Sequence, residues 1–377
     1  MKKWYLLCLL ACVGCAVVKA PVIDDKPLPV IPKDDIVLSF AAVGDNLIHG
    51  AVYHDARIAA NIYDFTPMYE PVKEDIVKAD IAFINQETIL GGKAMGLSHY
   101  PLFNSPEEVA QAISTLGFDL VNHASNHSLD KGEKGILNAI ATWRQYPDIV
   151  MNGIHDSSEA QQTIPLLKRN DVTIAFLAYT QNTNGLQPPK GKGYLVDYID
   201  KKRIEHDVKK AKELADLVIV SMHWGSEDTF AANDYQKEYA DFLHELKVDV
   251  VIGTHPHTIQ PVAMKQTGDH QTLIIYSLGN FLSAQDDVDN MMELMMKWSI
   301  RIQQEPKKVT IENVTCVPLI NHFAAGFKQF RVYKYKDYTK ELLSKHGLQG
   351  YKGQSMTFPN LTKKFNEVLS DGCKIDL

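Results

Sequence analysis

The sequence predicts a layered α/β fold, and three observations point to it. Patterns typical of short buried strands alternate with helical patterns from residue 36 to about residue 285. Polar side chains able to bind metals follow directly after several of these strands. The alternation then stops, and 296–303, 308–318 and 328–335 read as strands without intervening helices. We expect these last segments to form an antiparallel edge or a second sheet.

The first half of the chain contains three strand and three helix patterns. The expected strands are 36–43, 80–84 and 118–121. The expected helices are 66–78, the segment from 105 to 117, and the segment after residue 130. Thr66-Pro67 and the capping box that starts at Ser105 are typical helix starts, and Asp130 can cap the third helix.

The second half repeats the pattern until the alternation ends. The expected strands are 172–179, 217–222, 249–252 and 273–276, rich in β-branched residues. One helix from about residue 201 and another around 239–246 each show one apolar face. The polar segment 336–377 predicts only a helix around 338–345.

Composition narrows the class of protein. The chain has 377 residues, 45% hydrophobic and 23% charged, which suits one large or two modest globular domains. Its net charge of −7 leaves no basic footprint for nucleic acid. Asp and Glu outnumber Lys and Arg only by 46 to 39, so strong electrostatic capture of a polyanion is not expected either.

The N-terminus predicts export and anchoring. Lys2 and Lys3 precede an apolar run, so 1–15 reads as a lipoprotein-type signal peptide. Cys12 and Cys15 each end an imperfect lipobox, and a lipid on either would anchor the protein outside the cytoplasm at the cell membrane. An uncleaved anchor or a soluble secreted protein are the alternatives. The Pro-rich segment 16–36 reads as a stiff tether.

Two further cysteines lie in the body of the chain. Cys316 and Cys373 can pair in an exported protein, although two cysteines do not establish a disulfide. The chain has no CxxC motif, so a thiolate metal site is not expected.

The ends of the predicted strands carry the chemistry. Potential ligands stand just past five strands, at Asp45, Glu87, Asn126, His223 and His255. Ligands bind at the carboxyl edge of open α/β sheets, so we expect these side chains in one cleft. With His257, they offer carboxylates, an amide and imidazoles, a set that suits Mn, Fe or Zn. Six donors indicate two ions sharing a carboxylate. A loop with two solvated histidines is the alternative for His255 and His257.

Six motifs in order resemble the CapA family, whose members are associated with poly-γ-glutamate capsule synthesis. They are Gly44-Asp45, Asn85-x-Glu87, Asn126-His127-x-x-Asp130-x-Gly132, His223-Trp224-Gly225-x-Glu227, Gly253-x-His255-Pro256-His257-x-x-Gln260 and Tyr276-Ser277-x-Gly279-Asn280-Phe281. The resemblance implies a CapA-type domain over 37–320 and a C-terminal extension over 321–377. It also implies the two-sheet α/β sandwich and dinuclear metal centre of calcineurin-like metallophosphoesterases.

The resemblance assigns a role to each matching residue. Asp45 and His257 would bind the first ion and Glu87 would bridge, while Asn126, His223 and His255 would bind the second. His127 would stabilise charge or protonate the leaving oxygen, with Asp130 in the same catalytic motif.

One position departs from the phosphoesterase pattern. Leu47 stands where a histidine ligand is usual, two residues after Asp45. His49 is the candidate replacement ligand, and a surface histidine is the other interpretation.

Three residues are candidates for substrate binding. Asn182 and Asn184 lie at the same sheet edge, where a polar turn explains them equally well. Glu227 could contact substrate, orient His223, or be a solvated carboxylate.

These features predict a membrane-tethered, metal-dependent hydrolase, and the resemblance implies that it acts on an anionic cell-envelope polymer or a phosphoester within it, in capsule or poly-γ-glutamate biosynthesis. The alternative is a non-catalytic capsule-assembly or polymer-binding subunit that retains the metal cleft, with capsule-synthesis proteins as partners. A metallopeptidase for γ-glutamyl bonds lacks support, since the chain contains no HExxH motif.

Overall fold

The computed structural model describes residues 35–305 and 307–377, which belong to one compact unit. The predicted signal peptide with Cys12 and Cys15, and all but the end of the predicted tether, lie outside the described residues. Among the described helices, none is both long enough and apolar enough to span a membrane.

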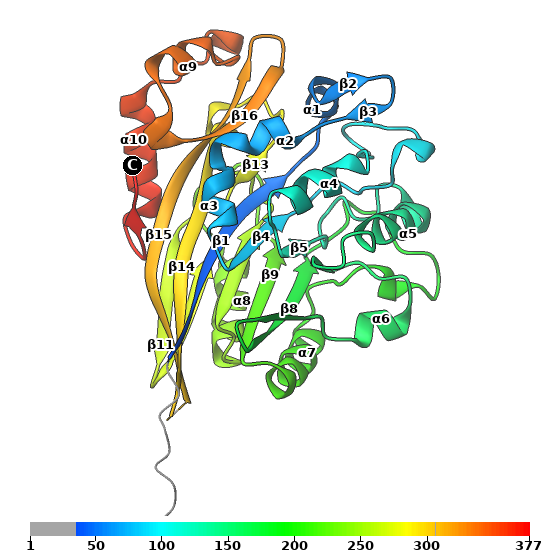
Figure 1. Ribbon diagram of the computed structural model, residues 1–377, viewed down its shortest axis with the longest axis vertical. Coiled ribbons are helices and arrows are strands. Elements are labelled where there is room, and N and C mark those ends of the chain that lie inside the picture. Colours follow the sequence, from blue (N-terminus) through cyan, green and yellow to red (C-terminus); the bar gives the residue numbers. More distant parts are fainter. Residues whose placement is uncertain (1–34, 306) are drawn as a thin grey trace, which may run out of the picture. The chain divides into compact units, whose positions relative to one another are not determined.

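The first sheet is built around strand β1 (Ile36–Asn46), as Figure 1 shows. On one side lie the parallel strands β4 (Ile81–Asn85), β5 (Leu120–Asn122) and β6 (Val150–Asn152). On the other side lie the antiparallel strands β14 (Met292–Gln304), β15 (Lys307–Ala324) and β16 (Lys328–Lys334). The predicted antiparallel strands are therefore confirmed, and they extend the edge of this sheet.

The second sheet contains the strands of the middle of the chain. Its order is β11 (Val262–Thr267), β12 (His270–Ile275), β10 (Val250–Thr254), β9 (Leu217–His223), β8 (Val172–Thr180) and β7 (Leu166–Arg169). The central four strands run parallel, and β11 and β7 are antiparallel edges. The sequence patterns predicted the central four and missed both edges.

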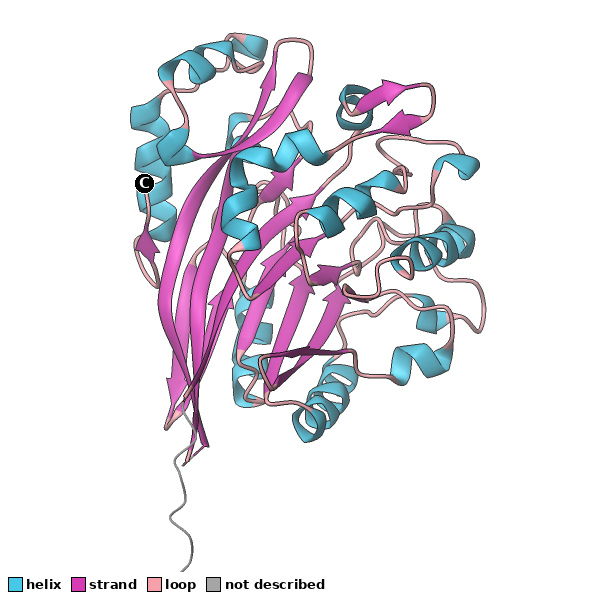
Figure 2. Cartoon of the chain, viewed as in Figure 1, coloured by secondary structure: helices cyan, strands magenta, loops and turns pink. Residues whose placement is uncertain are grey.

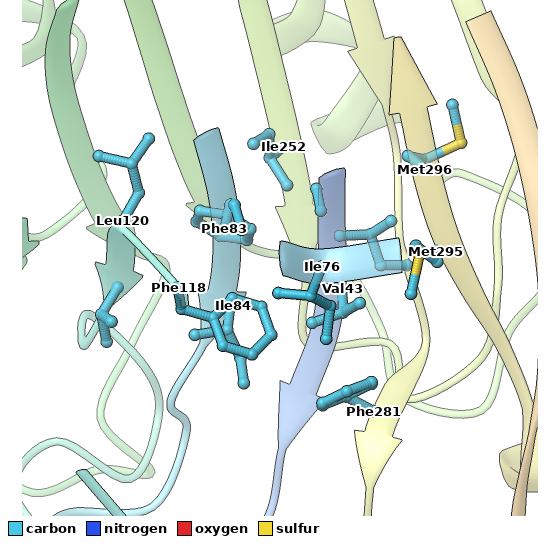
Figure 3. Close-up of a cluster of buried hydrophobic side chains, with 14 of the residues drawn as sticks. Val43, Ile76, Phe83, Ile84, Phe118, Leu120, Ile252, Phe281, Met295 and Met296 are labelled. Carbon is cyan, nitrogen blue, oxygen red and sulfur yellow. The ribbon is translucent and has the colours of Figure 1, made fainter. Parts of the chain in front are cut away.

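Alternation along the strands explains why the two sheets pack face to face. In β9, Leu217 and Ile219 enter the core shared with the first sheet, whereas Val218 and Val220 pack under the helices α7 (Lys201–Leu214) and α8 (Asp234–Glu245). Figure 3 shows part of the shared core. The rings of Phe83 and Phe176 meet edge to face across it, 5.9 Å apart. The predicted layered α/β class is confirmed.

The remaining elements surround these sheets, and Figure 2 shows helices at the periphery of the strands. The other α-helices are α1 (Gly50–Asp55), α2 (Thr66–Tyr69), α3 (Lys73–Val77), α4 (Glu108–Thr115), α5 (Gly132–Trp143), α6 (Ser158–Gln162), α9 (Lys340–Lys345) and α10 (Phe358–Leu369). The short strands are β2 (Arg57–Ala59), β3 (Ile62–Tyr63), β13 (Asn280–Leu282) and β17 (Lys374–Ile375). The 3₁₀ helices are η1 (Glu70–Val72), η2 (Lys93–Met95), η3 (Gly193–Leu195), η4 (Val288–Met291), η5 (Tyr335–Asp337) and η6 (Tyr351–Gly353).

The three predicted helix caps of the first half are wrong. Thr66 lies inside α2 and makes no capping bond. The Ser105 hydroxyl donates to the Thr88 hydroxyl at 2.8 Å, and no side chain caps α4. Asp130 accepts hydrogen bonds from the Phe103 amide and the His127 ring and does not cap α5. For Ser105 and Asp130, partners distant in sequence replace the helix end that local spacing suggested.

The C-terminal region contains more structure than its polarity suggested. The predicted helix is present as α9, but α10 was missed although Leu361, Phe365 and Leu369 repeat at four-residue spacing and are all buried. Cys316 and Cys373 form a disulfide with Cα atoms 5.8 Å apart.

Candidate metal centre

The site lies where the carboxyl ends of both sheets meet. Asp45 is the penultimate residue of β1, and Glu87 follows β4 in the same sheet. His223 ends β9, and His255 follows β10 in the other sheet. Gly44 allows this approach, because a Cβ atom there would stand 1.8 Å from the carbonyl oxygen of Gly279. The Asp45 amide donates to that carbonyl at 2.9 Å, so the end of β1 is held beside the second half of the chain.

One group of potential ligands contains Asp45, Glu87 and His257. Their ligand atoms lie within 4.8 Å of one another, and all three residues are buried. The His257 ring places Nδ1 3.1 Å from Oδ2 of Asp45 and Nε2 3.8 Å from Oε1 of Glu87. Two carboxylates and an imidazole around one point suit a divalent cation.

A second group shares Glu87 and adds His223 and His255, again within 4.8 Å of one another. Asn126 reaches the same place, with its Oδ1 3.0 Å from Nε2 of His223. The other ring nitrogen of His223 lies 2.9 Å from the Thr254 hydroxyl. When Nδ1 donates to that hydroxyl, Nε2 is free to bind an ion.

The backbone after β10 explains how His255 and His257 serve one centre. Both residues have positive φ, 98° and 59°, so the chain turns and does not point the two rings to opposite faces. The ring centroids are 5.9 Å apart. The amide of His255 donates to Oδ2 of Asp45 at 3.2 Å, which helps hold this turn in place.

The electrostatics of these residues fit a divalent ion. Both carboxylate oxygens of Glu87, and Nδ1 of His255, are buried without a hydrogen-bond partner among the described residues. Burial raises the pKa of Glu87 well above its usual value. Burial and then neighbouring histidines lower the pKa of His255 to about 3 and that of His223 well below the usual range. A cation bound here would provide a partner for the buried Glu87 carboxylate and for Nδ1 of His255 at the same time.

His257 behaves in the opposite way. Burial lowers its pKa, but the charges of Glu87 and Asp45 outweigh burial and raise the pKa to about 10. The ring of His257 thus lies between the two carboxylates of the first group.

His127 lies beside the second group. Its Nδ1 is 2.7 Å from Oδ2 of Asp130, and the Phe103 amide donates to the same oxygen at 2.7 Å. The Ser125 hydroxyl accepts from the His127 amide at 3.1 Å and donates to the Glu87 carbonyl at 2.7 Å. The structure thus ties the His127–Asp130 pair to the segment that carries Glu87.

The candidate substrate residues occupy different positions. Asn184 accepts a hydrogen bond from Nδ2 of Asn126 at 3.4 Å, so it borders the centre. Asn182 accepts from the Asn184 amide at 2.9 Å and shapes the turn. Glu227 is exposed, and its carboxylate lies within 4.8 Å of ring nitrogens of His255 and His257. The partner found beside His223 is Thr254, not Glu227.

His49 lies apart from these groups. It belongs to none of the three possible metal groups found among the described residues. Its Nδ1 accepts the Ala284 amide at 3.2 Å, and the residue lines a neighbouring cavity of about 660 Å³ with His54, His99 and Lys328. Leu47 is buried, and its amide donates to the Leu282 carbonyl.

The sequence interpretation assigned no role to two polar residues that support the centre, although Asn85 was part of a motif. Asn85 donates to Oδ1 of Asp45 at 2.6 Å and accepts from Asn122 at 2.7 Å. Thr254 positions His223, as described above. The available signal was a polar side chain ending an otherwise apolar buried strand.

The comparison with protein families shows which family the chain belongs to. The family model described as bacterial capsule synthesis protein PGA_cap matches residues 39–285, more than half of the chain. This chain belongs to the PGA_cap family. The resemblance predicted from the six motifs is confirmed.

Two relatives named for capsule or PGA biosynthesis match part of the chain. The PGA_cap chain is 31% identical over 187 residues to the PGA biosynthesis protein CapA of Bacillus subtilis (strain 168), covering 47% of this chain and 45% of the relative. It is 29% identical over 183 residues to the capsule biosynthesis protein CapA of Bacillus anthracis, covering 48% and 43%. The matched regions thus span less than half the length of each relative.

Solved structures show weaker likeness. A phosphatase from Mycoplasma pneumoniae matches with a TM-score of 0.44 and 15% identity, over 76% of this chain and 94% of that chain. At this score, the likeness by itself assigns no activity to the PGA_cap chain.

Proposed function

We propose that this PGA_cap protein is a divalent-metal-dependent hydrolase with phosphoesterase-like chemistry that acts in capsule or poly-γ-glutamate biosynthesis. The observation that carries the proposal is the pair of ligand groups that share Glu87. A carboxylate that belongs to two ligand groups can bridge two ions in a dinuclear centre. The relatives named for PGA and capsule biosynthesis support the process, and an anionic cell-envelope polymer or a phosphoester within it is the proposed substrate.

The chain supplies a donor set for each of two ions. Asp45, Glu87 and His257 would hold the first ion, and Glu87, Asn126, His223 and His255 the second. The mixture of carboxylate, amide and imidazole suits Mn, Fe or Zn. When bound, such ions supply Lewis-acid stabilisation of an oxyanion and lower the pKa of water.

His127 would supply proton transfer. Asp130 accepts from Nδ1 of the ring, which leaves Nε2 to donate a proton to the departing oxygen. Because Asp130 is also held by the Phe103 amide, the ring is oriented before substrate arrives. A site that only bound metal or polymer would not need this histidine. Asn184, next to Asn126, would contact the substrate at the border of the centre.

We also propose that the protein acts outside the cytoplasm, tethered to the cell membrane. The charged start, the apolar run and the cysteines at positions 12 and 15 support a lipid anchor. The disulfide between Cys316 and Cys373 is consistent with an oxidising compartment. Other capsule-synthesis proteins would then be its partners.

The alternative is a capsule-assembly or polymer-binding subunit without turnover. Leu47 favours it, because the first group lacks the histidine that the phosphoesterase pattern places there.

Metal analysis and turnover assays on the full chain separate the two functions. We would measure bound Mn, Fe and Zn by mass spectrometry, and hydrolysis of bis(p-nitrophenyl) phosphate and poly-γ-glutamate, for wild type and His127→Ala. The hydrolase proposal expects bound metal and a turnover that His127→Ala lowers by about 10²- to 10⁴-fold. Bound metal with no His127-dependent turnover on either compound would favour the assembly subunit, and absence of bound metal would overturn the hydrolase.

A further inference from the structure

Glu227 lies in the loop between β9 and α8, beside the turn that carries His255 and His257. Its carboxylate oxygen and one ring nitrogen of each histidine lie within 4.8 Å of one another. This group contains one histidine assigned to each ion, His257 of the first and His255 of the second, and it does not include Asp45 or Glu87. Glu227 is the exposed member, whereas both histidines are buried.

Backbone contacts fix the Glu227 loop against the histidine turn. The Trp224 amide donates to the Thr254 carbonyl at 3.1 Å, and the Asp228 amide donates to the Pro256 carbonyl at 2.9 Å. The Thr258 hydroxyl then donates to the Thr229 carbonyl at 2.8 Å. These bonds lie on both sides of Glu227, so its position next to the two histidines is built into the fold.

The residues between His223 and Glu227 serve this placement. Trp224 is fully buried, and its Nε1 donates to the Tyr276 carbonyl at 3.0 Å. Gly225 has a φ of 95°, and a Cβ atom there would stand 2.7 Å from the side chain of Gln236. The loop therefore turns sharply after His223, which brings Glu227 to the mouth of the centre.

The two ion positions differ in their number of donors. The second position has four protein donors, namely Glu87, Asn126, His223 and His255. The first position has Asp45, Glu87 and His257. Leu47 supplies no donor, and Nδ1 of His49 accepts the Ala284 amide.

We infer that the Glu227 carboxylate is a ligand of the first ion, beside His257, and supplies the fourth donor that this position lacks. The inference rests on the proposed metal centre and adds a ligand to it. The first ion would then have three carboxylates and one imidazole, against one carboxylate, one amide and two imidazoles for the second. Oxygen-rich sets suit Mn²⁺, whereas imidazole suits Zn²⁺ and Fe²⁺, so the first position prefers Mn²⁺.

Mn²⁺ titration of the metal-free full chain tests this assignment. Calorimetry would give the number and affinity of the ions, and electron paramagnetic resonance would show whether two Mn²⁺ ions are spin-coupled. We expect Glu227→Gln to lower the affinity for one ion by roughly 100-fold or more. Loss of a group that only orients a ligand already lowers metal affinity by about 10- to 100-fold. The coupled signal of wild type would be replaced by that of a single ion.

Three variants make the result specific. Glu213→Gln removes an exposed carboxylate from α7 and should leave both ions unchanged. Asp45→Asn should lower the affinity for the same ion as Glu227→Gln, whereas Asn126→Ala should lower the affinity for the other ion. Circular dichroism would show that each variant is folded.

Two outcomes would overturn the inference. One is that Glu227→Gln binds both ions with wild-type affinity. The other is that it loses affinity for the same ion as Asn126→Ala. Either result would leave the proposed hydrolase intact. If wild type itself bound no ion, the metal centre and the proposed function would both be wrong.

Discussion

The ring of His127 and the carboxylate of Asp130 form a buried pair, with Nδ1 2.7 Å from Oδ2. The same carboxylate oxygen accepts the amide of Phe103, a residue that precedes α4 in the sequence. The pair orients one nitrogen of His127 and leaves the other available for proton transfer.

His127→Ala should lower kcat by about 10²- to 10⁴-fold, the usual contribution of a positioned acid or base. Metal content should stay unchanged, because His127 is in none of the ligand groups found among the described residues. His206→Ala is the control, since that side chain is 69% exposed on α7. A variant that lost its metal together with its turnover would show that His127 has a different role.

Glu87→Gln should release both ions, because Glu87 belongs to both groups. Glu293→Gln is a matched control: its oxygens are also buried without partners, but it belongs to no ligand group within the described part of the chain. Metal analysis of the two purified variants checks this prediction. Retention of one ion by Glu87→Gln would exclude a bridging role.

Asp249, which is not part of the metal centre, should make the stability of the fold depend on pH. Burial raises its pKa from 3.8 to about 7, against opposing effects of the Val218 amide and nearby lysines. Between about pH 4 and pH 7, Asp249 keeps its proton in the folded state and loses it in the unfolded state. The free energy of unfolding therefore falls as the pH rises through this range, and below about pH 4 this group causes no loss. The loss is roughly 4 kcal/mol.

Asp249→Asn should remove this pH-dependent loss of stability, because the amide does not titrate. Its side-chain oxygen can still accept the hydrogen bond from the Val218 amide. Urea denaturation of wild type and variant between pH 4 and 8 measures the difference. Asp269→Asn, whose side chain is 95% exposed, should keep the wild-type dependence. Identical pH profiles for wild type and Asp249→Asn would contradict the prediction.

Gly44→Ala should destabilise the fold by about 1–3 kcal/mol, because the new Cβ meets a backbone carbonyl that cannot move freely. The displaced end of β1 should also weaken ion binding through Asp45. Gly193→Ala places its Cβ in open space and should change neither property. Chemical denaturation and Mn²⁺ titration would reveal both effects, and wild-type values for Gly44→Ala would count against this account of the strand end.

Cys373→Ser should lower the free energy of unfolding by about 4 kcal/mol, as expected for a cross-link that closes a loop of 57 residues. Reduction of wild type should produce a similar loss, measured by urea denaturation with and without reductant. A reductant effect of equal size in Cys373→Ser would mean that another pair of cysteines is responsible.

The strand patterns alone predicted the class of fold and the sheet edge where the candidate ligands lie near one another. Buried strands require continuous apolar runs, so β1, β4, β8, β9 and β10 could be found without a structure. Parallel strands deliver their carboxyl ends to one edge of a sheet, which is why Asp45 and Glu87 could be expected together. His223 joins them because the carboxyl ends of the second sheet meet the same edge. The edge strands β7 and β11 were missed because exposed strands carry mixed, polar sequences.

Only the tertiary structure decided how those side chains are used. The sequence places His255 and His257 two residues apart, where an extended chain would point their rings in opposite directions. Positive φ at both residues, held by the carboxylate of Asp45 from the other sheet, turns the rings into one centre. The same holds for the contact of Asp130 with the Phe103 amide and for the approach of Glu227 to His255 and His257, which join distant segments. Local sequence sets the periodicity of each element, whereas a contact between sheets exists only after both have packed.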